Sequence, residues 1–150
     1  MGVISVPQAI FIHALGSNFL EMLPGEFVPR TYPIRAMLDA GLTVALSSDA
    51  PVVEDDNPLA GMAAAITRRS KEGRLIAPEQ AITAHEALYA YTMGGAIAAG
   101  QSAIRGSIKP GKLADVTVLS ADPLAVEPEE LPEICVEMTF LGGQAQYGVL

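Results

Sequence analysis

Short apolar runs alternate with helix-like segments along the N-terminal part of the chain. The run 43–46 (Thr-Val-Ala-Leu) is apolar and partly β-branched, which is typical of a strand covered on both faces in a parallel sheet. Polar residues follow at once at 47–49 (Ser-Ser-Asp), and Pro51 ends the strand because proline cannot donate to a strand ladder. A shorter apolar run at 3–6 is also followed by a proline. The pattern predicts two strands, and an acid directly after one of them.

The segment before the second strand has the features of a helix. We expect the helix to begin at Thr31 or Tyr32, with Pro33 in the first turn, where no amide donor is needed. An apolar stripe at i, i+3, i+4 spacing comprises Ile34, Met37 and Leu38. Gly41 is placed to end the helix. A helix, a glycine and a buried strand form the αβ half of a repeating βα architecture.

A second helix is predicted from Asn57 to Gly73. Asn57 is a good N-cap, and Pro58 suits the first helical position. The apolar stripe of this helix comprises Leu59, Met62, Ala63 and Ile66. The basic residues of the last turns suit the negative end of the helix dipole and need no ligand to explain them: Arg68, Arg69 and Lys71.

Residues 8–32 are predicted to be irregular, because two glycines and two prolines interrupt them. Long connections in compact domains are usually functional or mobile. His13 lies in this segment between apolar neighbours, and no second histidine stands within ligand spacing. We interpret His13 as a packing residue rather than a metal ligand.

Residues 78–80 are predicted to form a brief turn or a one-turn helix, and the segment after them is predicted to be helical. Thr83 and Glu86 have the spacing of a capping box. We expect His85, in the first turn, to be exposed. Thr92 is placed to cap a second short helix over 93–99, which a glycine would end.

From residue 105 the pattern becomes that of β-strands. Residues 114–119 and 136–141 alternate, and Gly142-Gly143 is a two-residue hairpin signal. The chain then returns over 144–147 as a partner strand. The acidic, proline-bearing segment 127–132 is predicted to be a surface loop.

Composition narrows the class of protein. Half of the 150 residues are hydrophobic and 17% are charged, so the chain is globular rather than disordered. The net charge of −8 argues against nucleic acid and anionic membranes as partners, and no apolar run reaches membrane-spanning length. The single cysteine, Cys135, excludes an internal disulfide, and we expect it to be buried. No signal-peptide pattern opens the chain, so a cytoplasmic protein is expected.

Asp49 is the candidate for chemistry. The carboxyl ends of strands carry the active sites of α/β folds, and a carboxylate there can bind a metal or act as a general base. The alternative is that Asp49 only caps the turn after its strand, as aspartate often does.

Four blocks, taken in order, carry a resemblance to a known family. They are 41–51, which ends Ser-Ser-Asp-Ala-Pro; 83–92, which contains Thr83, Glu86 and Tyr91; 106–115, Gly-Ser-Ile-Lys-Pro-Gly-Lys-Leu-Ala-Asp; and 139–143, Thr-Phe-Leu-Gly-Gly. Together they resemble the C-terminal part of an amidohydrolase family 3 protein, of the metal-dependent amidohydrolase superfamily. The block at 106–115 is the most specific.

The resemblance implies an α/β fold: the C-terminal portion of a (β/α)8 TIM-type barrel, followed by strands of a flanking β-sandwich. Residues 1–104 would be the last βα units of the barrel, and residues 105–150 would be the sandwich strands. A partial barrel leaves sheet edges open. We therefore expect either a piece of a longer enzyme, a truncated reading frame, or a chain that completes itself by association as a homo-oligomer.

The resemblance also implies a function. Asp49 would be both a metal ligand and the catalytic proton acceptor, with a divalent metal, zinc being the expected ion, and a small-molecule, amide-like substrate. The histidine ligands of the family have no match here, because His13 and His85 stand at other positions. Two hypotheses follow: a hydrolase of non-peptide C–N bonds, or a non-catalytic, self-associating remnant of one. Deamination of a heterocycle is a variant of the first.

Overall fold

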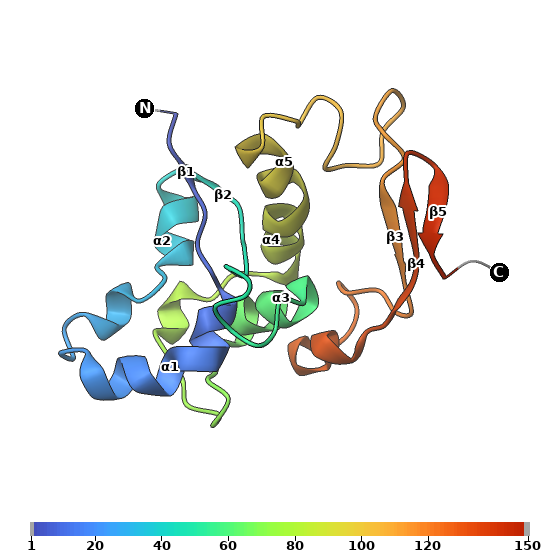
Figure 1. Cartoon of the computed structure of the whole chain (residues 1–150). Coiled ribbons are helices and arrows are strands. Elements are labelled where there is room, and N and C mark those ends of the chain that lie inside the picture. The colour runs from blue at the N-terminus through green and yellow to red at the C-terminus, as the bar shows by residue number, and fades with distance from the viewer. Residues whose placement is uncertain (1, 149–150) are drawn as a thin grey trace.

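The computed structural model describes residues 2–148, which form an α/β part and a separate antiparallel sheet (Figure 1). Two short strands pair in parallel: β1 (Ile4–Ser5) and β2 (Thr43–Val44). The second sheet has the order β3-β4-β5 and comprises β3 (Val116–Leu119), β4 (Val136–Leu141) and β5 (Gln144–Tyr147). This mixed α/β content is the class that the sequence predicts.

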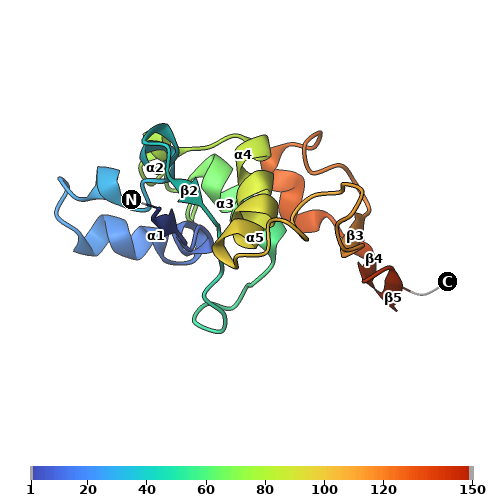
Figure 2. The same ribbon diagram turned by 90° about the horizontal axis from the view of Figure 1, so that it is seen from above.

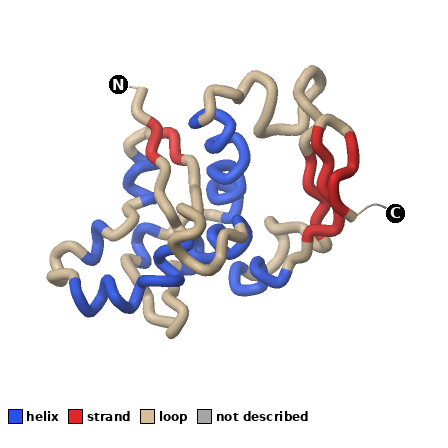
Figure 3. Tube along the Cα trace, in the orientation of Figure 1, coloured by secondary structure: helices blue, strands red, loops and turns tan. Residues whose placement is uncertain are grey.

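The helices gather around the parallel strands, as the blue segments of Figure 3 show. They are α1 (Ile10–Met22), α2 (Ile34–Asp39), α3 (Pro58–Thr67), α4 (Ala84–Tyr89) and α5 (Gly95–Ala98). Shorter helical segments are the 3₁₀ helices η1 (Val28–Arg30), η2 (Pro78–Gln80) and η4 (Pro128–Glu133) and the π-helical segment η3 (Ala90–Gly94). Seen from above, α4 and α5 lie between the parallel pair and the β3–β5 sheet (Figure 2). Within residues 2–148, no helix combines the length and the apolar character that crossing a membrane requires.

The two predicted strands are confirmed and pair as neighbours. Pairing continues past β2, since the amide of Ala45 donates to the carbonyl of Ser5 at 2.9 Å and the amide of Ser47 donates to that of Pro7 at 3.1 Å. Ala45 and Leu46 are buried. The carboxyl ends of both strands therefore point to the same edge.

The helix before β2 ends as predicted but begins later. Gly41 has a φ of +73°, and its amide donates to Leu38 while the amide of Leu42 reaches back to Met37. This is the Schellman ending that favours glycine. The predicted start at Thr31 or Tyr32 is wrong, because α2 begins at Ile34.

The prediction of an irregular 8–32 segment is wrong, because α1 occupies its first half. The N-cap position, Ala9, makes no side-chain hydrogen bond, so the usual start signal is missing. Gly16 lies inside the helix, where a Cβ would stand 2.6 Å from the Ile76 side chain. Gly16 allows α1 to pack closely against Ile76. From the sequence alone, the same glycine is interpreted as a helix breaker.

The start of α3 is confirmed and its end is not. The Asn57 side chain accepts a hydrogen bond from the Leu59 amide at 2.9 Å, and Pro58 takes the first helical position. The helix ends at Thr67, six residues before Gly73, because Arg68 adopts a left-handed conformation with a φ of 55°. The prediction that Arg68 lies in the last turns of this helix is therefore wrong, and its side chain is fully buried.

The capping box of Thr83 and Glu86 is confirmed, but the predicted break at Thr92 is wrong. The chain runs on from α4 through η3 into α5, and the Thr92 hydroxyl donates to the carbonyl of Leu88 at 2.7 Å instead of capping a new helix. Gly94 lies against the carbonyl oxygen of Val44, where any Cβ would clash. This contact joins the helix to β2.

Two predictions for the acidic segment are also wrong. Residues 128–133 form η4 rather than a loop, and Leu131 is 1% exposed and belongs to the main core. Cys135, which we expected to be buried, is exposed. Ile134, next to it, is buried in its place. The predicted hairpin at Gly142-Gly143 is confirmed.

Candidate functional site

Asp49 lies just beyond the carboxyl end of β2, at the edge that β1 shares. Its backbone is left-handed, with a φ of 57°, and its carbonyl accepts a hydrogen bond from the Val52 amide at 3.0 Å. The residue is exposed. The apolar run before it is buried, so the polarity switch in the sequence corresponds to the end of the covered strand.

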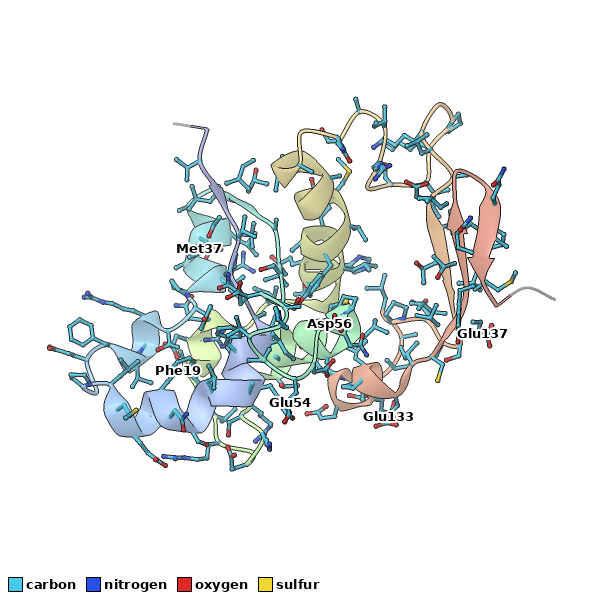
Figure 4. The ribbon with its side chains drawn as sticks, viewed as in Figure 1. Phe19, Met37, Glu54, Asp56, Glu133 and Glu137 are labelled. Carbon is cyan, nitrogen blue, oxygen red and sulfur yellow. The ribbon has the colours of Figure 1, made fainter. Side chains whose placement is uncertain are left out.

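Tyr32 comes from the turn that precedes α2. Its ring stands edge-on to Phe11, with centroids 6.3 Å apart, and tilted against Phe19 at 6.0 Å. Figure 4 shows Phe19 on α1. Partial burial, with a smaller contribution from the negative charge of Asp49, raises the pKa of the Tyr32 hydroxyl. The group is therefore a hydrogen-bond donor at neutral pH.

An open groove of about 590 Å³ runs between the start of α1 and the loop that follows Asp49. The loop side contributes Val52 to Asp55, among which Glu54 is labelled in Figure 4. The opposite side contributes His13 and Lys71. His13 is exposed, so our packing interpretation of it is wrong. The groove holds both acidic and basic groups beside the strand ends.

The metal-binding capacity of these residues can be tested against their geometry. A protein metal site usually has three or four side-chain ligands. Within residues 2–148, no group of three or more His, Cys, Asp or Glu side chains is close enough to hold an ion. His85 is exposed on α4, as predicted, and His13 lies in the groove. Asp49 therefore belongs to no such cluster, and the described residues alone do not fit a complete metal site.

Arg68 is the residue that sequence inspection misinterpreted. Its guanidinium donates to three backbone carbonyls: Nε to Ile76 at 3.0 Å, Nη1 to Tyr32 at 3.2 Å and Nη2 to Thr31 at 2.7 Å. Burial lowers the pKa of the Arg68 guanidinium to about 10. The negative charge of Glu79 offsets part of this lowering. No sequence pattern predicts this role, because every residue type carries a backbone carbonyl that can accept such a hydrogen bond.

Comparison with known proteins places the chain in a family. Residues 11–147 match the model of the amidohydrolase family. The N-substituted formamide deformylase of Arthrobacter pascens is 39% identical over 118 residues, which cover 79% of this chain and 22% of that enzyme.

Two solved structures share the fold. A metal-dependent hydrolase from Pyrococcus horikoshii, itself uncharacterised, has a TM-score of 0.72 and 26% identity, over 85% of this chain and 26% of that one. An adenosine deaminase from Xanthomonas campestris with bound zinc has a TM-score of 0.59 and 25% identity, over 76% of this chain and 28% of that one.

The chain thus spans about a quarter of the length of the curated relatives it matches. The match nevertheless extends over nearly all of the 150 residues and includes both the strand that leads to Asp49 and the antiparallel sheet. On this basis the chain belongs to the amidohydrolase family, of the family 3 type.

Proposed function

We propose that the chain takes part in hydrolysis of a non-peptide C–N bond in a small, amide-like substrate. The observation that carries this proposal is an exposed acid at the carboxyl end of a buried parallel strand, in a chain of this family. The similarity to an N-substituted formamide deformylase supports the amide class of substrate. In this proposal residues 1–104 are the last βα units of a barrel, and residues 105–150 are strands of a β-sandwich.

Asp49 is the residue to which we assign the chemistry, as one metal ligand and as the acceptor of a proton. A bound divalent ion such as zinc supplies an acidified water in this class of reaction. The other ligands would come from outside the described residues, in a longer chain or a second copy. The neutral Tyr32 hydroxyl is a hydrogen-bond donor, which is the kind of group that can orient a substrate carbonyl.

A second candidate is a non-catalytic, self-associating remnant. Among residues 2–148 no cluster of three or more His, Cys, Asp or Glu side chains could hold a metal ion, and this favours the remnant. Large apolar side chains at the β1 end and on the loop after Asp49 are also exposed, including Val3 (56%) and Val52 (64%). Such surfaces promote association when they form a patch.

The deciding experiment compares Asp49→Asn with Asp56→Asn in a hydrolysis assay on an N-substituted formamide. Asp56 is an exposed acid of the same loop and serves as the matched control (Figure 4). We expect Asp49→Asn to lower kcat/KM by about 10²- to 10⁴-fold, the usual contribution of a proton-transfer group. Asp56→Asn should leave kcat/KM unchanged. Full activity of Asp49→Asn, with an unchanged circular dichroism spectrum, would refute the assignment.

Metal content separates the two candidates. About one zinc per chain by plasma mass spectrometry, lost in Asp49→Asn and retained in Asp56→Asn, is expected for the hydrolase. The remnant instead predicts no bound metal in either protein and dimers or larger species in light scattering.

A further inference from the structure

Arg68 is a buried cation without an anionic partner among the described residues. Its exposed fraction is 0%, and each of its three hydrogen bonds goes to a backbone carbonyl. Burying an unpaired charge is costly, and an apolar side chain would fill the same space without that cost. The guanidinium therefore has a role that packing alone does not explain.

Two of the three backbone carbonyls that accept hydrogen bonds from Arg68 lie on one turn, formed by Thr31 and Tyr32. Tyr32 has a φ of 47°, a left-handed conformation that is rare and costly for an aromatic residue. The turn is closed by a hydrogen bond from the Ile34 amide to the Tyr32 carbonyl at 2.7 Å. A strained turn of this kind persists only when its surroundings hold it.

The same turn contains an unsatisfied group. The Thr31 hydroxyl oxygen is buried and has no hydrogen-bond partner within residues 2–148. Buried hydroxyls normally find a partner, and leaving one without costs free energy. The local interactions of the turn thus disfavour its conformation. The charge-assisted hydrogen bonds from Arg68 to the Thr31 and Tyr32 carbonyls stabilise it.

Arg68 is itself fixed from the other side. It follows the last residue of α3, and its carbonyl accepts a hydrogen bond from the Ile76 amide at 2.8 Å while its Nε donates to the Ile76 carbonyl. This two-way pairing orients the guanidinium away from the helix end. The side chain links the end of α3 to the turn that carries Tyr32.

We propose that Arg68 is a positioning residue: it fixes the Thr31–Tyr32 turn and thereby holds the Tyr32 ring against Phe11 and Phe19 of α1, on the core cluster that contains Val44 and Leu46, the buried residues that precede Asp49. The importance of that position for catalysis rests on the proposed function. The positioning itself does not, so it can be measured on the ring of Tyr32.

The experiment is acetylation of tyrosines by N-acetylimidazole, measured residue by residue by mass spectrometry of tryptic peptides. Tyr32 falls in the short peptide 31–35. Tyr89 and Tyr147, which are 53% and 60% exposed, report full reactivity. Tyr91, whose ring lies against Gly61 of α3, reports whether the core stays closed.

Arg68→Lys keeps the charge but loses the planar fork that reaches three carbonyls. We expect the acetylation rate of Tyr32 to rise about tenfold, as for the loss of one charge-assisted hydrogen bond, while that of Tyr91 stays constant. Arg69→Lys is the matched control, since Arg69 is exposed and its guanidinium donates to the Gly73 carbonyl at 3.1 Å. The Arg69→Lys variant should leave the acetylation rate of Tyr32 unchanged.

Two results would overturn the proposal. An unchanged rate at Tyr32 would mean that the turn holds itself, and a parallel rise at Tyr32 and Tyr91 would make Arg68 a stabiliser of the whole core. Arg68→Met, which keeps the length without the charge, must show the same local effect in any folded preparation. If Asp49→Asn retains turnover, the proposed function fails while the labelling result stands by itself.

Discussion

The two sheets of this molecule are stabilised in different ways. Around β2, Val44, Ala45 and Leu46 are 3%, 2% and 6% exposed, with helices covering them. The structure describes every strand residue of the β3–β5 sheet, and none of these residues is buried. The first sheet is held by packing, whereas the second depends on its ladder hydrogen bonds and on its attachment to the rest of the chain.

The attachment runs through η4 and a set of polar contacts. Leu131 and Ile134, just before β4, are buried in the core of the α/β part, and η4 packs against α3. At the other end, Arg105 pairs with Asp115 at 3.2 Å, and the Lys112 ammonium donates to the Ser102 carbonyl at 2.6 Å. The second region is thus stabilised largely by side chains that lie outside its strands.

The largest effect is expected when this attachment is removed. Leu131→Ala should lower the free energy of unfolding by about 2 to 5 kcal/mol, the usual cost of truncating a fully buried leucine. Leu141→Ala, in β4, should cost far less, because Leu141 is 56% exposed. Urea unfolding followed by circular dichroism measures both. Equal losses would mean that the sheet is as tightly packed as the α/β part.

A smaller effect is expected at the contact between η3 and β2. Gly94→Ala should destabilise the α/β part by about 1 to 3 kcal/mol, because the new Cβ meets the carbonyl oxygen of Val44, which is backbone and cannot rotate away. Gly95→Ala is its neighbour and control: nothing lies within 4 Å of its Cβ. It should stabilise by about 0.5 to 1 kcal/mol through helix propensity. Thermal unfolding of the pair should give shifts of opposite sign, and shifts of the same sign would contradict the contact.

Local chemistry accounts for the parts of the fold that the sequence predicts correctly. Asn57 before Pro58, Thr83 three residues before Glu86, and the Gly142-Gly143 turn each satisfy backbone groups within a few residues. The misinterpreted elements depend on distant partners. The helix α1 lacks a capping side chain, and its Gly16 is explained only by Ile76, which is 60 residues away in the sequence.

The candidate site shows the same division. The switch from an apolar run to Asp49 is local, so the position of this acid at a strand end could be predicted. Tyr32 and Arg68 are linked to each other through a left-handed turn and through backbone carbonyls. No side-chain pattern in the sequence predicts a left-handed turn at an aromatic residue or a backbone carbonyl that accepts from a distant arginine, so only the folded chain reveals them.

The smallest expected effect concerns acid stability, and it again separates the two regions. Burial alone would raise the pKa of Glu86, but hydrogen bonds from the Thr83 amide and the Arg35 guanidinium, which lies 2.6 Å away, lower it below 4.5 overall. Glu137, in β4, is exposed and makes no ion pair among the described residues (Figure 4). Acid should therefore act on the α/β part first.

A carboxylate whose pKa is lower in the folded state stabilises the protein above its unfolded pKa and loses that stabilisation as the pH falls through the folded value. The contribution of Glu86 should therefore be complete above pH 4.5 and decline below it. Glu86→Gln should cost about 0.5 to 1 kcal/mol at pH 7, as expected for a partly exposed ion pair, and should flatten the dependence of stability on pH below 4.5. Glu137→Gln should change neither. Urea midpoints between pH 3 and 7, in buffers of constant ionic strength, measure this difference, and identical pH profiles for the two variants would show that acid acts on both regions alike.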